Sequence, residues 1–244
     1  MSIKVVLFDL DGTLLPMDQD IFVKAYFKGI ATKLAPHGYE PKALIDAIWA
    51  GTKDMIKNDG HCTNEEAFWK RFSAIYGEES LKDMPLFEQF YIENFDEVKS
   101  VCGYHPAAKE AVEKLKQSGI RVALATNPIF PAVATEKRIR WAGLSPEDFE
   151  FYTTYENSTY CKPNLCYYKE ILKRLDIAPE ECLMVGNDVG DDMVAEALGM
   201  QVFLLTDHLI NKSGCDLSAY NQGGFPELLE FLDTLITERS LEND

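Results

Sequence analysis

The chain opens with a short apolar run that leads straight into two aspartates one residue apart. The stretch Val5–Phe8 is wholly apolar, and the sequence DLDGT follows it at residues 9–13. A short apolar run bounded by turn residues is typical of a strand that is buried on both faces, as in a parallel sheet. Carboxylates crowded at the end of such a strand are costly unless something positive lies among them. The stretch therefore predicts a parallel sheet with a polar site where its first strand ends.

Four more apolar runs predict further strands. They are Arg121–Ala125, Phe149–Tyr152, Cys182–Val185 and Gln201–Leu205. Helical stretches separate them, with Pro106 and Pro131 near first-turn positions and Gly119 and Gly143 as C-terminal stops. Because strands that alternate with helices pair in parallel through right-handed crossovers, we expect a doubly wound α/β sheet.

Residues 16–100 have a helical pattern throughout. One apolar stripe recurs at every fourth residue, namely Phe22, Tyr26, Ile30 and Leu34. Pro41 opens a second helix, and Thr63 with Glu66 has the spacing of a capping box that starts a third. A fourth helix is expected around residues 87–98. Since this block lies between the first two strands, it predicts an inserted helical cap domain.

The expected domains are therefore an α/β core of residues 1–15 and 101–244, and a cap of residues 16–100. Aromatic side chains at helical spacing are more often core than a substrate site, so we expect five to form the interior of the cap: Phe22, Tyr26, Trp49, Trp69 and Phe72. Basic cap residues such as Lys24, Lys28 and Arg71 could meet a second anionic group of a substrate, or could simply be solvated.

Composition excludes several classes of partner. The 244 residues carry a net charge of −16, which repels nucleic acids and anionic membranes. There is no apolar run of about 18 residues and no secretory pattern at the start, so we expect a cytoplasmic protein, as monomer or homodimer. The six cysteines form no CxxC pair and are expected to be reduced thiols. The four histidines are scattered, without zinc-ligand spacing.

Polar residues follow each of the main predicted strands. Thr126 and Asn127 come after the second strand, Lys162 lies in CKPN after the third, and GNDVGDD at residues 186–192 follows the fourth. Ligands bind outside the carboxyl ends of the strands in an open parallel sheet, so we expect these side chains in one cleft with Asp9 and Asp11. Oxygen ligands favour a hard cation such as Mg²⁺ over zinc. A cation and a lysine facing a free carboxylate suggest phosphoryl transfer.

These residues carry a resemblance to a known family. DLDGT, ATN, KP and GNDVGDD, in this order and each after a predicted strand, resemble the four motifs of the haloacid dehalogenase (HAD) superfamily. The resemblance spans nearly the whole core. The helical insertion is similar to the cap of the subgroup that resembles phosphoglycolate phosphatase and beta-phosphoglucomutase.

The resemblance implies a role for each residue. Asp9 would attack phosphorus and form an aspartyl-phosphate, and Asp11 would protonate the leaving oxygen and then activate water. The Gly12 turn can bring Asp11 over the site. Thr126 and Lys162 would bind the phosphoryl oxygens. Thr13 and Asn127 are assigned to the same phosphate- and substrate-binding set.

The implied Mg²⁺ ligands are Asp9, Asp11 through its backbone carbonyl, and a third residue from the fourth motif. That motif departs from the commonest family form, because Asn187 follows the glycine where many members have an aspartate. We favour Asp188 as the third ligand, with Asn187 and Asp192 as contenders.

The sequence thus indicates a Mg²⁺-dependent phosphatase that acts on a small phosphorylated metabolite. A sugar-phosphate mutase or phosphotransferase, a haloacid dehalogenase and a catalytically silent binding protein remain alternatives. Purely structural roles also stay open. They are an Asp-Gly turn at residues 11–12, helix capping by Thr126 and Asn127, a solvated Lys162, and stabilisation of the acidic residues at 188–192 by the N-terminus of a helix.

Overall fold

A parallel sheet forms the centre of the core. In the computed structural model, which describes residues 2–242, five strands pair in the order β2-β1-β3-β4-β5. Their bounds are β1 Val5–Phe8, β2 Arg121–Leu124, β3 Cys182–Gly186, β4 Gln201–Leu205 and β5 Asn221–Gly223. All four pairings are parallel, which confirms the predicted α/β sheet. The central position of β1 places the residues that follow it between those that follow β2 and β3.

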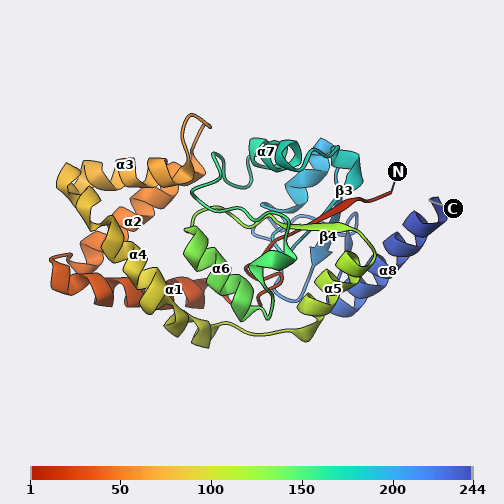
Figure 1. Ribbon diagram of the computed structural model, residues 1–244, viewed down its shortest axis with the longest axis horizontal. Coiled ribbons are helices and arrows are strands. Elements are labelled where there is room, and N and C mark those ends of the chain that lie inside the picture. Colours follow the sequence, from red (N-terminus) through yellow and green to blue (C-terminus); the bar gives the residue numbers. More distant parts are fainter. Residues whose placement is uncertain (1, 243–244) are drawn as a thin grey trace.

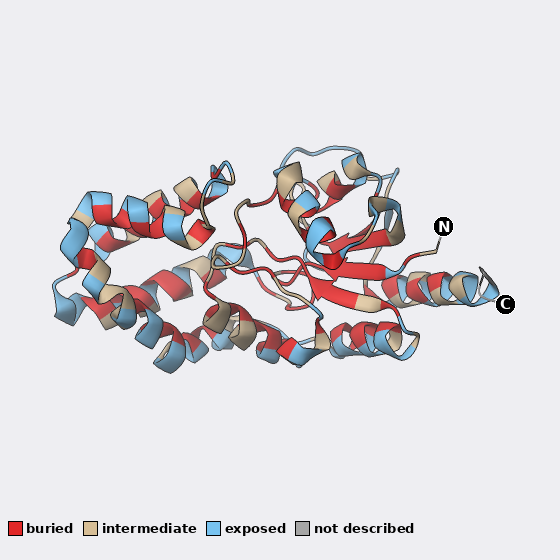
Figure 2. Ribbon diagram, turned by 45° about the horizontal axis from the view of Figure 1, so that its top comes forward, coloured by how far each residue is buried: buried red, intermediate tan, exposed pale blue. Residues whose placement is uncertain are grey.

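Helices cover both faces of the sheet (Figure 1). Val6 and Phe8 pack with the side chains of α5 (Pro106–Gln117) and α8 (Phe225–Glu242). Val5 and Leu7 pack on the opposite face, against α7 (Leu165–Leu175) and the 3₁₀ helix η6 (Met193–Leu198). Because successive strand residues point to opposite faces, the uninterrupted apolar run of β1 serves two layers of core. Strands β1 to β4 are buried along almost their whole length, as the central strands of Figure 2 show, whereas the edge strand β5 is mainly exposed.

Two details of the sheet differ from the prediction. Phe149–Tyr152, expected as a strand, follows the short 3₁₀ helix η4 (Pro146–Asp148) and contributes only an isolated bridge between Tyr152 and Leu124. Its backbone bonds to β2, but the chain then turns away at residues 154–157, which leaves too few paired residues for a strand. The edge strand β5 was not expected, because its sequence, NQG, has no apolar residue to signal it.

Helices form the insertion between β1 and α5, at the end of the molecule opposite both termini (Figure 1). They are α1 Gln19–Leu34, α2 Pro41–Ile56, α3 Asn64–Tyr76 and α4 Met84–Glu93, with the 3₁₀ segments η1 Ala35–His37, η2 Glu78–Asp83 and η3 Phe95–Val101. The Thr63 hydroxyl accepts from the backbone N–H of Glu66 at 3.2 Å, and the Glu66 carboxylate accepts from the N–H of Thr63 at 2.9 Å. The capping box is therefore confirmed. The fourth helix begins three residues earlier than expected and gives way to η3 after Glu93.

Most of the expected aromatic residues do pack inside the cap. Phe22, Tyr26, Trp69 and Phe72 are buried. Trp49 is an exception, because 49% of it is exposed, so its assignment to the interior was wrong. Trp49 packs against Phe27, at a ring-centroid distance of 5.3 Å, and lines a cavity described below.

The chain enters and leaves the cap at neighbouring points. The N–H of Gly103 donates to the carbonyl of Pro16 at 2.7 Å, and Met17 and Cys102 form an antiparallel bridge. The helix α6 (Ala132–Trp141) belongs to the core sequence but packs against α4 and η3. The division into residues 1–15 with 101–244 and residues 16–100 stays a prediction, although the helices of the insertion fall within a few residues of those limits.

The six cysteines are all unpaired, and all lie within the described range 2–242, as expected. In the same range no helix is both long and apolar enough to cross a membrane.

Candidate active site

The polar residues that follow β1, β2 and β3 meet in one cavity of about 180 Å³. Eight of its lining residues are predicted site residues: Asp9, Asp11, Thr126, Asn127, Lys162, Asn187, Asp188 and Asp192. The cap contributes Met17, Gln19, Phe22 and Val23, and the loop before α6 contributes Phe130. The cavity therefore lies at the carboxyl edge of the sheet, where core and cap meet.

Asp9 is held firmly at the base of this cavity. Its N–H donates to the carbonyl of Val185 on β3 at 2.9 Å, which extends the ladder by one residue. One carboxylate oxygen, Oδ1, lies 2.9 Å from Nζ of Lys162, and the other, Oδ2, lies 3.1 Å from the hydroxyl oxygen of Thr13. The side chain is thus oriented by a cation and by a hydroxyl donor.

A tight turn after Asp9 directs Asp11 back to the same cavity. Gly12 has a φ of +86°, a conformation that side-chain-bearing residues rarely adopt, and its N–H donates to the carbonyl of Leu15 at 2.8 Å. A Cβ atom at this position would collide with the side-chain amide of Asn187. The glycine therefore permits both the turn and the close approach of the loop after β3.

Asp11 has a partner that the sequence analysis missed. Its Oδ2 pairs with the guanidinium of Arg138, which is fully buried in α6 and also lies 4.5 Å from the ring centroid of Phe130. Its other oxygen, Oδ1, is buried without a hydrogen-bond partner. Burial raises the pKa of the Asp11 carboxyl, although Arg138 lowers it. The sequence alone did not mark Arg138, because its burial and its contact with Asp11 depend on how α6 packs.

Lys162 is 2% exposed and lies between two carboxylates. Its Nζ is 2.9 Å from Oδ1 of Asp9 and 2.6 Å from Oδ1 of Asp192. Burial lowers the pKa of this ammonium group, but Asp192 and Asp9 outweigh that effect and hold the pKa well above its usual value. Lys162 is therefore a buried, paired cation and not a solvated surface lysine.

Asp192 is also buried, and both of its oxygens already accept hydrogen bonds. Oδ1 accepts from Lys162, and Oδ2 accepts from the N–H of Asp188 at 2.9 Å. Gly186 makes room for this arrangement, since a Cβ there would overlap the Asp192 carboxylate. Asp192 thus positions Lys162 and fixes the loop after β3.

The remaining residues of that loop face Asp9 in different ways. The amide oxygen of Asn187 lies 3.0 Å from the Thr13 hydroxyl, and its Nδ2 donates to the carbonyl of His208 at 2.7 Å. Asp188 lines the cavity, and its Oδ1 accepts from the N–H groups of Gly190 at 2.8 Å and Asp191 at 3.2 Å. Asp188 therefore lines the cavity as a negatively charged oxygen donor, whereas Asn187 is neutral.

Thr126 and Asn127 do not cap the following helix. The first N–H of α6, that of Ala132, donates instead to the carboxylate of Glu156 at 2.9 and 3.1 Å. Thr126 is 2% exposed, and the amide oxygen of Asn127 is buried without a hydrogen-bond partner. Both residues line the cavity, so both are available to a bound ligand.

The family follows from a comparison of the whole chain with known proteins. Residues 3–199 match the family model described as a hydrolase, the haloacid dehalogenase-like hydrolase. The chain is a haloacid dehalogenase-like hydrolase. The matched range includes the segments of all four motifs.

Among relatives of this hydrolase, pyrophosphatase PpaX from Bacillus cereus is 26% identical over 193 residues, which is 78% of this chain and 77% of PpaX. A predicted phosphoglycolate phosphatase from Haemophilus somnus has the same fold, with a TM-score of 0.59, 19% identity and coverage of 95% and 99% of the two chains. A putative beta-phosphoglucomutase from Thermotoga maritima matches with a TM-score of 0.56 and 20% identity, over the same shares of the two chains. The putative hydrolase YfnB from Bacillus subtilis, solved with bound magnesium, matches with a TM-score of 0.55 and 18% identity. The match again covers 95% of this chain and 99% of YfnB.

The donor set of this hydrolase fits a hard divalent cation. Asp9 and Asp188 bring two carboxylate side chains to one cavity, which Asp11 also lines. Across residues 2–242, no three His, Cys, Asp or Glu side chains are close enough to form a complete metal cluster. A Mg²⁺ site does not require a cluster of three such side chains, because the ion usually takes one or two carboxylates and completes its coordination shell with water and substrate phosphate.

Proposed function

We propose that this hydrolase is a Mg²⁺-dependent phosphatase that forms an aspartyl-phosphate on Asp9. The observation that carries the proposal is the orientation of Asp9 by Lys162 and Thr13, at the base of a cavity that Asp11 also lines. An anionic nucleophile beside a buried ammonium group can attack phosphorus, because the cation also attracts the phosphoryl oxygens. The names of PpaX and of the phosphoglycolate phosphatase neighbour support the same class of reaction.

In the first step, an oxygen of Asp9 attacks the phosphorus atom and the bond to the alcohol oxygen breaks. Asp11 gives its proton to that oxygen, so that a neutral alcohol leaves. Burial raises the pKa of Asp11, which favours the protonated form needed here. In the second step, Asp11 takes a proton from water, the water oxygen attacks phosphorus, and the Asp9 carboxylate and inorganic phosphate are released.

Lys162 and Thr126 would bind the non-bridging oxygens throughout, and Asn127 would bind the substrate or fix the loop. A Mg²⁺ ion held by Asp9, the Asp11 carbonyl and Asp188 would neutralise charge on the phosphoryl group. We favour Asp188 over the contenders because Asp192 is occupied by Lys162 and Asn187 bonds to Thr13 and His208. The partner is thus a small phosphorylated metabolite, and neither nucleic acid nor a membrane suits a chain with a net charge of −16.

The test compares wild type with Asp9→Asn on a panel of phosphomonoesters, with Mg²⁺ or with a chelator. We expect turnover only with Mg²⁺, and a fall of about 10⁴-fold or more in kcat for Asp9→Asn, as for other lost nucleophiles. Asp20→Asn, an exposed change of the same chemistry on α1, is the matched control and should retain wild-type rates.

Two results would contradict the proposal. If folded wild type hydrolyses none of the esters with Mg²⁺ present, the chain is a silent binding protein or uses another reaction. If phosphate appears on an added hexose phosphate rather than in water, the enzyme is a phosphotransferase that uses the same Asp9 chemistry.

A further inference from the structure

A second and larger cavity lies beside the catalytic one. It measures about 400 Å³ and is enclosed by α1, α2, α3 and α4 of the cap and by core residues 129–133 and 155–156. Val23, Ile129 and Phe130 line both cavities. A group joined to a phosphate at Asp9 can therefore extend past these three side chains into the larger space.

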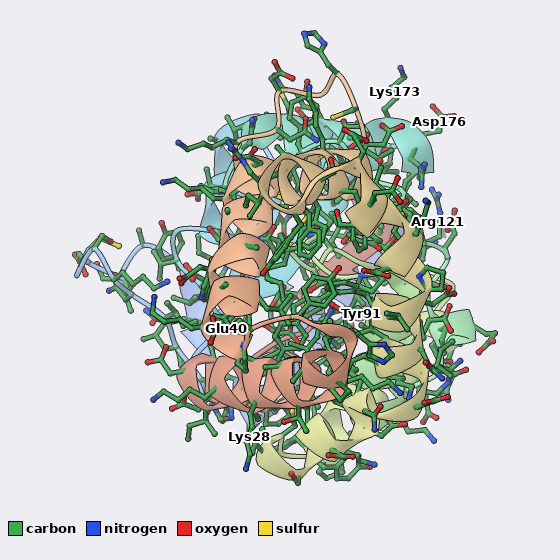
Figure 3. The ribbon with its side chains drawn as sticks, turned by 90° about the vertical axis from the view of Figure 1, so that its left-hand side faces the viewer. Lys28, Glu40, Tyr91, Arg121, Lys173 and Asp176 are labelled. Carbon is green, nitrogen blue, oxygen red and sulfur yellow. The ribbon has the colours of Figure 1, made fainter. Side chains whose placement is uncertain are left out.

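The walls of this cavity are mainly apolar and aromatic. Seven aromatic residues of the cap line it: Tyr26, Phe27, Trp49, Phe68, Trp69, Phe87 and Tyr91. Figure 3, which looks onto the cap, shows Tyr91 within the space framed by the cap helices. Protein interiors contain few voids larger than a water molecule, whereas small-molecule sites have volumes of about 300–1,000 Å³. The size and lining of this cavity are those of a binding site rather than of a packing defect.

The charges around the cavity all have the same sign. Glu65, Glu88 and Glu156 line it, and no Lys, Arg or His does so within the described range. Burial and the neighbouring Glu156 raise the pKa of the Glu65 carboxyl, as expected where carboxylates are close together away from water. A second anionic group on a ligand would be repelled here.

The basic cap residues considered for such a group lie elsewhere. Neither cavity is lined by Lys24, Lys28 or Arg71. Lys28 projects outward from α1 in Figure 3 and is exposed. Arg71 pairs with Asp54 at 2.7 Å on the surface of the cap. The cap thus offers apolar contact to a leaving group and no cation.

We propose that the substrate is the phosphomonoester of a bulky apolar alcohol, with an aromatic ring or a branched hydrocarbon group and no second negative charge. This proposal rests on the proposed phosphatase function, and it assigns the larger cavity to the alcohol portion. Small phosphates are then poor substrates, because they leave the aromatic walls unfilled, and an anionic group long enough to reach the larger cavity meets three glutamates.

The experiment uses three alkyl phosphates with leaving groups of similar acidity, so that intrinsic reactivity does not decide the result. They are 2-(1-naphthyl)ethyl phosphate, ethyl phosphate and 3-phosphooxypropanoate. We expect kcat/KM for the naphthyl ester to exceed that for the ethyl ester by about 100-fold, since even one methylene in an apolar pocket gives about 10-fold or more. The carboxylate ester should be hydrolysed more slowly than the ethyl ester.

Two variants locate the effect in the cavity. Trp49→Ala should lower the ratio of naphthyl to ethyl ester in kcat/KM by about 10-fold, mainly through KM. Ile56→Ala is its matched control, because Ile56 lies on the same helix, is 46% exposed and does not line the cavity. Glu88→Lys should raise kcat/KM for the carboxylate ester, whereas Glu97→Lys, an equal charge change at an exposed position of η3, should not.

The outcomes separate the two proposals. If the enzyme hydrolyses the ethyl or carboxylate ester as well as the naphthyl ester, the inference about the alcohol is wrong and the phosphatase function stands. If a folded, Mg²⁺-loaded enzyme hydrolyses none of the three nor the wider panel, the phosphatase function itself fails. If the preference is found but Trp49→Ala and Ile56→Ala behave alike, the cavity is not where the alcohol binds.

Discussion

The buried ion pair between Lys162 and Asp192 provides a sharp test of the site geometry. The two side chains are 2% and 1% exposed, and their charged atoms are 2.6 Å apart. Lys162→Met keeps the apolar stem and removes the ammonium group. Asp192 then loses its cation in a place that water does not reach.

The size of the effect follows from that burial. Removal of one partner from a buried pair costs about 3–5 kcal/mol, because the other charge stays behind uncompensated. The free energy of unfolding should therefore fall by about that amount, and Tm by about 10 °C or more. Lys114→Met is the matched control: its partner Asp233 is 2.8 Å away, but the pair is at the surface, so the loss should be about 1 kcal/mol or less.

A second substitution should partly reverse the first. In Lys162→Met with Asp192→Asn, no charge remains to be buried at position 192, so we expect the double variant to regain about 2–3 kcal/mol over the single one. Activity should not return, since Lys162 is still missing. Urea unfolding followed by circular dichroism, in the presence of a chelator, measures both stabilities without help from a bound metal.

The pH dependence of the single variant gives an independent check. Burial raises the pKa of Asp192 in the folded state above its unfolded value, and the loss of Lys162 raises it further. The penalty is therefore largest at high pH and shrinks as pH falls through the raised folded pKa, because the carboxyl is then protonated in the folded protein. A cost below about 1 kcal/mol at pH 8, or a double variant no more stable than the single, would refute this account of the pair.

Three further predictions follow from single contacts. Arg138→Leu should lower kcat by about 10-fold or more. It should also move the limb of the pH–rate profile that reports Asp11 to higher pH, because Arg138 lowers the pKa of that carboxyl. An unchanged pH profile would contradict the pairing of Arg138 with Asp11. Gly12→Ala should cost about 1–3 kcal/mol in unfolding free energy and most of the activity, because of its φ of +86° and the collision with Asn187; near-wild-type kinetics would be inconsistent with the turn described. Thr63→Ala should cost about 1 kcal/mol by thermal unfolding through the loss of the capping box, and no measurable loss would mean that the box adds nothing to stability.

Much of the core was predictable because its signals are local. β1 and β4 have the predicted limits, and β2 and β3 differ from theirs by one residue, since each is an apolar run bounded by turn residues. Phe149–Tyr152 has the same local pattern but failed, because pairing depends on where the chain goes next. β5 has no local signal, and its pairing with β4 is decided by the tertiary fold.

The site was predictable in its members but not in its pairings. Sequence order placed the polar residues at one sheet edge, because parallel strands end together. Two ion pairs depend on helix packing, which residue spacing does not reveal. They are the pair of Asp192 with Lys162 and the pair of Arg138 on α6 with Asp11. The half-exposed Trp49 is a similar case: helical periodicity gives the face on which it lies, but not whether that face is filled.

The paired crossing at Pro16 and Gly103 has an evolutionary consequence. The chain leaves the sheet and returns to it through two adjacent segments, joined by the Gly103–Pro16 hydrogen bond and the bridge between Met17 and Cys102. Because the two ends of the cap segment are adjacent, we expect the segment between them to tolerate changes in length and sequence with little effect on the register of β1. Selection can therefore reshape the aromatic walls around a new alcohol while Asp9, Lys162 and their partners stay in place, so that substrate preference and chemical step diverge at independent rates.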